Sequence, residues 1–164
     1  MCGIVGAVSK REVAPKLIEG LKRLEYRGYD SAGLSTVESG SDLTQIREVG
    51  KVIGLEAIVA ESEMNGKLGI AHTRWATHGK PSIKNAHPHV SSDKISVVHN
   101  GIIENFQEIK EFLAKEGYEF QSETDSEVIP HLIHYHFEIV KDLLEAVRQS
   151  VKQLRGAYAV GVIH

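Results

Sequence analysis

The alternation of short apolar runs with helix-patterned segments limits the fold of this 164-residue chain more than any other feature. Residues 2–9 are apolar at almost every position, which indicates a strand covered on both faces rather than one half-exposed to water. The period then lengthens, and residues 13–26 predict a helix that ends before Gly28. One face of that helix carries Val13, Leu17, Leu21 and Leu24. Strands interleaved with helices in this way predict stacked layers of sheet and helix.

The rest of the chain continues this alternation. Short strands are predicted over 32–37, 43–49, 68–72, 94–99 and 157–163. Helices are predicted over 55–63 and 105–115, and the last helix is expected to present one apolar face made of Leu143, Val147, Val151 and Leu154. Thr124 and Glu127 match a capping box, in which Thr124 is the N-cap and Glu127 is the N3 residue, so another helix is expected to begin there.

Composition and charge exclude several classes of protein. Nineteen basic residues against twenty-two acidic residues give a net charge of −3, so neither a nucleic acid nor an anionic membrane surface is an expected partner. The sequence has no apolar run of the roughly 18 residues needed to span a bilayer, and no secretion signal at its N-terminus. A single cysteine cannot form an internal disulfide, which favours a reducing compartment. These properties predict one globular domain in the cytoplasm.

Cys2 is the first candidate for chemistry. A cysteine is more often a small buried hydrophobe than a catalytic group. Its position is nevertheless unusual, because removal of Met1 would leave a thiol and an α-amine on the same residue. An α-amine has an unperturbed pKa of about 7.7–8.0, so part of it is neutral at pH 7 and can accept the thiol proton. The thiolate is the stronger nucleophile, which makes Cys2 a candidate nucleophile.

Two polar segments follow apolar strands and could form a binding site. Residues 71–79 include Arg74, whose guanidinium can grip a carboxylate through two parallel hydrogen bonds, although a loop with structural histidines and a packed Trp75 is the simpler alternative. Asn100-Gly101 is typical of a hairpin turn, but the residues beyond it have a helical rather than an extended pattern. An Asn amide beside a Gly backbone N–H would instead make a good oxyanion hole.

Asp125 and the histidines complete the candidates. Asp125 lies in the first turn of a predicted helix, where it could either answer the helix dipole or face the site and hold a substrate ammonium. The histidines lack the H-E-x-x-H spacing of a metal site, and the single cysteine is far from them in sequence. His131 and His134 would share a helical face that His136 does not. No metal site is therefore predicted, and the histidines are interpreted as structural.

Six segments together match a known family. They are Met1-Cys-Gly-Ile-Val-Gly6, Leu24-Glu-Tyr-Arg-Gly-Tyr-Asp-Ser-Ala-Gly33, Ala71-His-Thr-Arg-Trp-Ala-Thr-His-Gly79, Asn85-Ala-His-Pro-His89, Val98-His-Asn-Gly-Ile-Ile-Glu-Asn105 and Ser122-Glu-Thr-Asp125. They resemble the N-terminal class II glutamine amidotransferase domain of the glucosamine-6-phosphate synthases, also called glutamine–fructose-6-phosphate aminotransferases (isomerising). The resemblance covers essentially the whole chain. Segments 24–33 and 71–79 point to this family over asparagine synthetase or the phosphoribosyl-pyrophosphate amidotransferase.

The resemblance implies an α+β fold, the four-layer αββα sandwich of the N-terminal-nucleophile hydrolases. It implies that Cys2 attacks the side-chain amide of glutamine with its own α-amine as general base, while Asn100 and Gly101 hold the oxyanion. Arg27 matches a family position that supports the neighbourhood of the nucleophile. No metal or organic cofactor is needed for this chemistry. The groups expected to surround the amino-acid end of glutamine are Arg74, Trp75 through its backbone, Thr77, His78, His87 at the border of the pocket, and Asp125.

The resemblance also implies partners. Water would free glutamate from a Cys2 thioester, and the ammonia would pass to sugar-isomerase domains that bind fructose 6-phosphate. Residues 1–164 contain nothing that resembles those domains, so they are expected to be the glutaminase domain alone, incomplete at its C-terminus, of a full-length enzyme that is a homo-oligomer. The alternatives are the glutaminase domain of another class II amidotransferase, or a catalytically silent domain that binds glutamine for regulation. Cys2 with Asn100-Gly101 argues against the silent domain, since binding alone needs neither.

Overall fold

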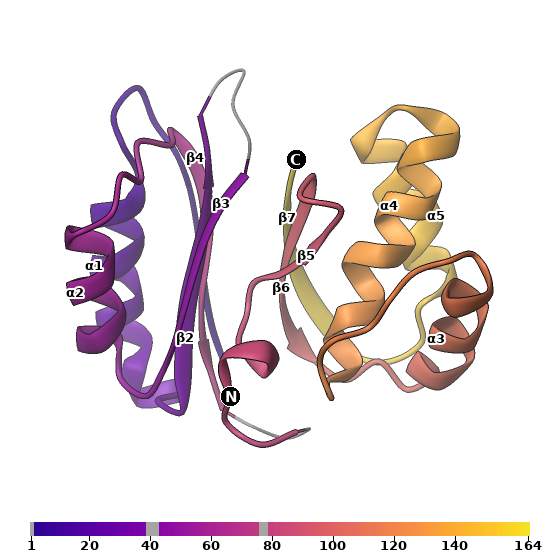
Figure 1. Cartoon of the computed structure of the whole chain (residues 1–164), viewed down its shortest axis with the longest axis horizontal. Coiled ribbons are helices and arrows are strands. Elements are labelled where there is room, and N and C mark those ends of the chain that lie inside the picture. The colour runs from indigo at the N-terminus through magenta and orange to yellow at the C-terminus, as the bar shows by residue number, and fades with distance from the viewer. Residues whose placement is uncertain (1, 39–42, 76–78) are drawn as a thin grey trace.

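The computed structural model describes residues 2–38, 43–75 and 79–164 and arranges them in four layers (Figure 1). The first layer has two helices, α1 (Ala14–Leu24) and α2 (Val52–Ala60). The second is an antiparallel sheet in the order β1 (Gly3–Val8), β4 (Leu68–Arg74), β2 (Ser31–Val37) and β3 (Leu43–Val49). The third is an antiparallel sheet in the order β5 (His89–Ser91), β6 (Ile95–Gly101) and β7 (Tyr158–Ile163). The fourth layer holds the helices α3 (Phe106–Lys115), α4 (Val128–Val140) and α5 (Leu143–Gln153).

A hydrophobic core lies between each sheet and the helices that cover it. The first core packs α1 and α2 on the four-stranded sheet, and its largest fully buried side chains are Leu17, Leu21, Leu34 and Leu55. The second packs α3, α4 and α5 on the three-stranded sheet around Ile95, Leu113, Ile129, Leu132 and Ile133. Burial of this apolar surface is the main favourable term that holds the outer helices to the sheets.

The space between the two sheets is more polar than either core. Its apolar part is the small cluster of Ile70, Val98 and Ile163. Beside it, the hydroxyl of Ser96 in β6 donates to the hydroxyl of Ser35 in β2 at 2.9 Å. Buried polar groups have to be paired, and pairing across this space fixes how the sheets lie on one another.

Most of the predicted elements are present. The strands predicted at 32–37, 43–49, 68–72, 94–99 and 157–163 correspond to β2, β3, β4, β6 and β7, and the helix predicted at 105–115 corresponds to α3. The helix predicted at 55–63 begins three residues earlier, at Val52. The short strand β5 was not predicted, because three residues are too few to show an alternating pattern.

The prediction that the first strand is covered on both faces is wrong for its outer end. In β1, Val5 and Ala7 pack on the helical core, whereas Val8 on the opposite face is 82% exposed. The reason is that β1 is an edge strand that pairs only with β4. An apolar run in the sequence does not distinguish a central strand from an edge strand with one uncovered end.

The predicted capping box does not form. Thr124 makes no capping bond, because its hydroxyl contacts the Ser122 hydroxyl at 3.0 Å and Nε2 of His89 at 3.1 Å. Glu127 accepts hydrogen bonds from the backbone N–H groups of residues 121 and 122 instead of reaching back to Thr124. A 3₁₀ turn, η3 (Asp125–Glu127), therefore precedes α4. The buried contacts with His89 of β5 and with residues 121–122 thus replace the local cap.

The apolar face predicted for the last helix is correct at three positions and wrong at Val151, which is 37% exposed. The buried centre of α5 is formed by Ala146 and Ser150, with Leu143 and Val147 packed beside them. Ser150 donates to the carbonyl of Ala146 at 2.8 Å, which satisfies a hydroxyl that would otherwise be buried without a partner. Because of this bond, Ser150 can face the core at the place where the apolar pattern predicted Val151.

Across the described ranges, none of the helices has both the length and the apolar character needed to cross a membrane.

Candidate active site

A cavity of about 320 Å³ lies where the ends of several strands meet, and its size falls within the roughly 300–1,000 Å³ of small-molecule sites. The pairing of β1 with β4 sets Gly3 opposite Thr73, so Cys2 at the start of the chain lies beside Arg74 at the end of β4. The end of β6 and the turn η3 supply the opposite wall. The lining residues are Cys2, Arg74, Trp75, His87, His99, Asn100, Gly101, Ile102, Thr124, Asp125 and Ser126.

Cys2 is partly buried, and its sulfur contacts the backbone of Trp75. The Trp75 N–H donates to Sγ at 3.5 Å, and the thiol lies 3.9 Å from the Trp75 carbonyl oxygen. Burial raises the pKa of the Cys2 thiol, and this effect outweighs the Trp75 N–H and the charge of Arg74, which lower it. The site does not generate a thiolate by electrostatics alone, so an attack by Cys2 requires a base.

Arg74 brings a buried positive charge to the cavity. Arg74 is 4% exposed as a whole residue, and its guanidinium donates to the carbonyl of Gly79 at 3.3 Å and lies 4.0 Å from a carboxylate oxygen of Asp30. The adjacent Trp75 is 47% exposed and packs edge-on against Tyr29, with ring centroids 5.5 Å apart. A charge held this firmly suits the recognition of a fixed carboxylate.

Gly28 is a residue whose part in the site the sequence did not reveal. It was predicted only as a helix stop, and it does follow the short 3₁₀ turn η1 (Glu25–Arg27) at the end of α1. Its backbone is extended, so no left-handed conformation requires glycine here. The requirement is steric, because a Cβ at this position would lie 2.6 Å from the carbonyl carbon of Arg74 and 3.0 Å from the nitrogen of Trp75. Only glycine lets the segment after α1 support the backbone beside Cys2.

The Asn100-Gly101 pair ends β6 and does not form a hairpin. The helical pattern of the residues beyond it had indicated this outcome. Gly101 has φ +141°, and a Cβ there would lie 2.3 Å from the carbonyl oxygen of Ala157 and 2.6 Å from Cα of Tyr158. This close approach of β7 requires glycine. The Asn100 side chain and the Gly101 backbone therefore sit in the cavity wall, on the sheet opposite to Cys2 and Arg74.

Asp125 is buried in the cavity wall and is not merely a partner of the helix dipole. One carboxylate oxygen accepts from the backbone N–H of Ile103 at 2.8 Å, and the other lies 3.5 Å from the hydroxyl of Ser126. A carboxylate has about four lone-pair sites, so these contacts leave it able to accept from a ligand. The cavity thus combines a guanidinium and a carboxylate, the charges that complement the two ends of an α-amino acid.

His87 lines the cavity and belongs to a cluster of buried imidazoles. Its ring stacks on His72 with centroids 4.2 Å apart and meets His89 edge-on at 4.6 Å. Burial, followed by the neighbouring imidazoles, lowers the pKa of His87 well below its ordinary value. Neither of its ring nitrogens has a hydrogen-bond partner among the described residues. A neutral imidazole with unused nitrogens at the edge of a cavity is suited to a hydrogen bond with a ligand.

The structure therefore brings seven of the ten predicted site residues to one cavity: Cys2, Arg74, Trp75, His87, Asn100, Gly101 and Asp125. Arg27 does not line it, and its guanidinium lies over the ring of Tyr26, 5.1 Å from the centroid. Thr77 and His78 fall outside the described residues.

Two further polar residues, Ser126 in the lining of the cavity and Asn85 outside it, were not found from the sequence. Ser126 hydrogen-bonds Nδ1 of His99 at 2.7 Å and so ties η3 to β6. Asn85 is fully buried, donates to the carbonyl of Lys80 at 2.9 Å and accepts from the N–H of Glu123 at 2.9 Å. Asn85 thereby links the segment after Arg74 to the segment that carries Asp125. Short-range pattern does not reveal these roles, because the contacts of Ser126 with His99 and of Asn85 with Glu123 join residues that are distant in sequence.

The histidines of α4 make contacts of an ordinary structural kind. Nδ1 of His131 bonds the hydroxyl of Ser91 at 2.8 Å, and His136 bonds Gln153 at 2.8 Å. His134 shares a hydrogen bond with the hydroxyl of Tyr118 at 2.9 Å. Within the described ranges, no three His, Cys, Asp or Glu side chains are grouped so that they could hold a metal ion.

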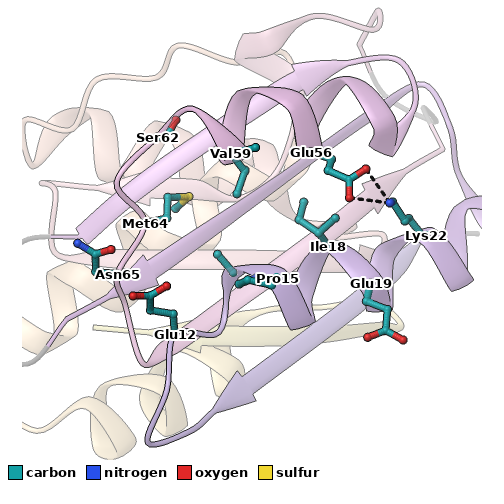
Figure 2. Close-up of a pocket in the computed structure, with 12 residues that line it drawn as sticks. Glu12, Pro15, Ile18, Glu19, Lys22, Glu56, Val59, Ser62, Met64 and Asn65 are labelled. Carbon is teal, nitrogen blue, oxygen red and sulfur yellow. Dashed lines mark hydrogen bonds and ion pairs between the residues drawn. The ribbon is translucent and has the colours of Figure 1, made fainter.

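A larger groove, of about 510 Å³, lies between α1 and α2, and Cys2 is not among the residues that line it (Figure 2). Ile18, Val59 and Met64 contribute apolar surface, and an ion pair of 2.6 Å joins Lys22 to Glu56 at its edge. The described residues that line it include neither a cysteine nor a histidine. The groups capable of covalent chemistry are concentrated in the smaller cavity.

Comparison with known proteins identifies the family to which the chain is similar. A family model described as a glutamine amidotransferase domain matches residues 72–164. A glutamine–fructose-6-phosphate aminotransferase [isomerizing] of Legionella pneumophila (strain Lens) is 55% identical over 164 residues, which are 100% of this chain and 27% of that protein. The enzyme of the same name from Vibrio vulnificus (strain YJ016) is 60% identical over 163 residues, again covering 27% of its length. The chain thus spans about a quarter of these relatives.

Solved structures with the same arrangement are also known. The glutamine phosphoribosylpyrophosphate amidotransferase from B. subtilis matches with a TM-score of 0.76 and 30% identity, over 99% of this chain and 34% of that one. An allosteric regulatory enzyme of purine biosynthesis matches with a TM-score of 0.78 and 31% identity. The fold is the four-layer αββα sandwich of the N-terminal-nucleophile hydrolases, as predicted. On its sequence, its fold and the residues of its cavity, the chain belongs to the glutamine amidotransferase domain family.

Proposed function

We propose that this domain hydrolyses the side-chain amide of glutamine to glutamate and ammonia through a thioester on Cys2. The observation that carries the proposal is the composition of one cavity. It contains a thiol, an Asn amide beside a Gly N–H, a buried guanidinium and a buried carboxylate. These are the groups needed to attack an amide, to stabilise its oxyanion and to hold the two charges of an α-amino acid.

The α-amine of Cys2, exposed by removal of Met1, is the proposed general base. Burial raises the pKa of the thiol, so a base has to take its proton. The imidazoles nearby are poor substitutes, because burial lowers the pKa of His72 to about 3 and also lowers that of His99. An α-amine with a pKa near 8 is much better matched to neutral pH.

The reaction then follows in two halves. The Cys2 sulfur bonds to the amide carbon of glutamine as the α-amine takes the thiol proton. The C–N bond breaks, the nitrogen leaves as ammonia with that proton, and a Cys2 thioester remains. The α-amine then takes a proton from a water molecule, whose oxygen bonds to the thioester carbon. The C–S bond breaks, the sulfur regains that proton as the thiol, and glutamate is released. In both halves, negative charge develops on the former amide oxygen, where Asn100 and Gly101 are proposed to donate hydrogen bonds.

The remaining predicted residues are assigned to the amino-acid end of glutamine. Arg74 is proposed to hold its carboxylate and Asp125 its ammonium, which their burial in the wall of the cavity supports. His87 and the backbone of Trp75 border the same cavity. By the family resemblance, Thr77 and His78 are proposed to help hold the amino-acid end of glutamine, and Arg27 is proposed to support the neighbourhood of the nucleophile. These assignments are proposals about individual residues within the family.

The ammonia is proposed to serve a longer protein. The relatives with 55–60% identity are named glutamine–fructose-6-phosphate aminotransferases, and this chain covers 27% of their length. We therefore place residues 1–164 as a glutaminase domain that supplies ammonia to sugar-isomerase domains of the same polypeptide, for the synthesis of glucosamine 6-phosphate from fructose 6-phosphate. The full-length enzyme is proposed to be a homo-oligomer of the cytoplasm, where a catalytic thiol stays reduced.

The two alternatives receive less support. The phosphoribosylpyrophosphate amidotransferase shares 30% identity, well below the aminotransferases. A silent domain that only binds glutamine would need neither the thiol nor the Asn100-Gly101 pair in its cavity.

The test of this proposal is Cys2→Ala in protein that lacks Met1. The variant should release no glutamate, while glutamine should still bind, because the holding groups lie on β4 and η3 rather than on Cys2. Glutamate release is followed by a coupled assay and glutamine affinity by calorimetry, with the wild-type protein measured in parallel. Release of glutamate by the variant at a rate near that of the wild type would refute the thioester mechanism.

A further inference from the structure

Four buried imidazoles lie at the cavity and behind it, where the two sheets face each other. His72 comes from β4 of the first sheet, His89 and His99 come from β5 and β6 of the second, and His87 precedes β5. His87 stacks on His72 and lies 6.3 Å from His99 between ring centroids. His72 is 1% exposed and does not line the cavity, so it cannot serve as a catalytic residue. Its role must therefore lie in the contacts that its ring makes with other residues.

His72 makes one hydrogen bond that joins the two sheets. Its Nε2 lies 2.9 Å from the carbonyl oxygen of His99. A carbonyl oxygen can only accept, so Nε2 carries the hydrogen and the tautomer of His72 is fixed. The ring is also neutral, because burial lowers the pKa of His72 to about 3. His72 is therefore a neutral donor that reaches from β4 to the backbone of β6.

The carbonyl that accepts this bond belongs to the peptide unit between His99 and Asn100. That unit is planar and includes Cα of Asn100, so fixing its oxygen fixes the position from which the Asn100 side chain departs. Further along, the N–H of Ile103 is held by Asp125 at 2.8 Å. The ring of His99 is held by Ser126 at 2.7 Å. The proposed oxyanion donors Asn100 and Gly101 thus lie between anchored points.

On the other sheet, His72 lies close to the groups that carry the nucleophile. It pairs with Ile4 of β1, two residues after Cys2, and it is two residues before Arg74 on β4. Cys2 and Arg74 therefore belong to the first sheet, whereas Asn100 and Gly101 belong to the second. The bond from His72 to the His99 carbonyl ties the position of the nucleophile to the position of the oxyanion donors.

We infer that His72 is a positioning residue, which sets the separation between Cys2 on one sheet and the Asn100-Gly101 oxyanion hole on the other through its bond to the His99 carbonyl. This inference rests on the proposed function. Because the oxyanion develops only during reaction, loss of the bond should lower kcat and leave KM for glutamine nearly unchanged. A misplacement of about 1 Å can cost roughly 10²-fold in rate, so a fall of about 10- to 100-fold in kcat is expected.

The test compares two amides at position 72 that differ by one methylene. The nitrogen of Gln can reach the place of the imidazole Nε2, whereas that of Asn reaches only the place of Nδ1. His72→Asn should lose about 10- to 100-fold in kcat with KM changed less than about twofold, and His72→Gln should recover kcat to within a few-fold of wild type. The matched control is His136→Asn, because His136 is also buried and bonds Gln153 through Nε2 at 2.8 Å, away from the site. It should lower thermal stability while kcat is unchanged.

Two results would overturn the inference while the proposed function stands. One is an active wild-type protein in which His72→Asn keeps its kcat, or in which His136→Asn loses as much kcat as His72→Asn. The other comes from nitrogen NMR of the wild-type protein, which does not depend on how the variants fold. The His72 ring should be the Nε2–H tautomer and should stay neutral down to pH 5, so an Nδ1–H tautomer or an imidazolium at that pH would contradict it. A wild-type protein without glutaminase activity would instead count against the proposed function.

Discussion

Gly28→Ala is expected to disable the site although Gly28 does not line the cavity. A Cβ at this position would lie 2.6 Å from the carbonyl carbon of Arg74, 2.8 Å from its oxygen and 3.0 Å from the nitrogen of Trp75. Carbon atoms in favourable contact are about 3.5–4.0 Å apart, so the end of β4 would have to move by roughly 1 Å. All three neighbours are backbone atoms, so no side-chain rotation can relieve the contact. The movement would displace both the guanidinium of Arg74 and the N–H that contacts Cys2.

The size of the effect follows from two separate terms. Overpacking of this kind costs typically about 1–3 kcal/mol of stability, which lowers Tm by roughly 2–12 °C in a domain of this length. Displacement of positioning groups by about 1 Å costs roughly 10²-fold in rate. The variant should therefore stay folded at 25 °C and lose about 100-fold in kcat/KM for glutamine.

The control is Gly6→Ala in the neighbouring strand β1, where the nearest atom to an added Cβ is 4.0 Å away. Both variants and the wild type are compared by thermal unfolding and by glutamate release. Gly6→Ala should match the wild type in kcat/KM. If Gly28→Ala also retained wild-type kcat/KM, the support of the nucleophile by the segment after α1 would be refuted.

Three further predictions follow from the same geometry. Asn100→Ala should raise the barrier by about 2.7–4 kcal/mol, or 10²–10³ in kcat, as for other oxyanion donors, and an effect on KM alone would make Asn100 a substrate-holding group. Arg74→Lys and Asp125→Asn should chiefly weaken glutamine binding in calorimetry, and unchanged affinity would return both residues to structural roles. Acid should destabilise the fold between about pH 6.5 and 3, because burial lowers the pKa of His72 and of His89 to about 3 from 6.5. In that window the unfolded chain binds protons that the folded chain does not, so each imidazole should remove up to about 1.4 kcal/mol of stability per pH unit. Urea unfolding across this range measures the effect, and a constant free energy of unfolding would show that these rings are not held neutral.

The layers of the fold were predictable because apolar periodicity reports which side chains face a core. The helix that carries Leu17 and Leu21 and the strand that carries Leu34 each show the spacing of their apolar residues within a short stretch of sequence. Local signals failed where distant partners decide the outcome. Thr124 and Glu127 have the spacing of a capping box, yet the hydroxyl of Thr124 bonds His89, which is 35 residues away.

The residues of the candidate site also divide into those that local sequence reveals and those whose role depends on distant contacts. Cys2, Arg74 and Asn100 could be named from the sequence because each carries a distinctive chemical group. Gly28 could not, because glycine is required there only by the close approach of the Arg74 backbone, which the sequence does not show. His72 was predicted only as a structural histidine, because the direction of its hydrogen bond depends on how the two sheets pack.

Removal of Met1 is the covalent step on which the proposed base depends. While Met1 is attached, the nitrogen of Cys2 is a peptide amide, which has no basic lone pair. Burial raises the pKa of the thiol, so without the α-amine it should remain protonated and unreactive at neutral pH. Protein that retains Met1 should therefore be folded but nearly inactive, and trimming by a methionine aminopeptidase should restore turnover.

The measurement that tests the central claim most directly is intact-mass analysis after incubation with an electrophilic glutamine analogue. A sample that contains both forms reports Met1 processing and thiol reactivity together. The form without Met1 should gain one adduct, mapped to Cys2 by peptide analysis, and an excess of glutamine should slow its formation. The form that retains Met1 should remain unlabelled over the same time. Equal labelling of both forms, or an adduct on another residue, would contradict the assignment of Cys2 as a nucleophile activated by its own α-amine.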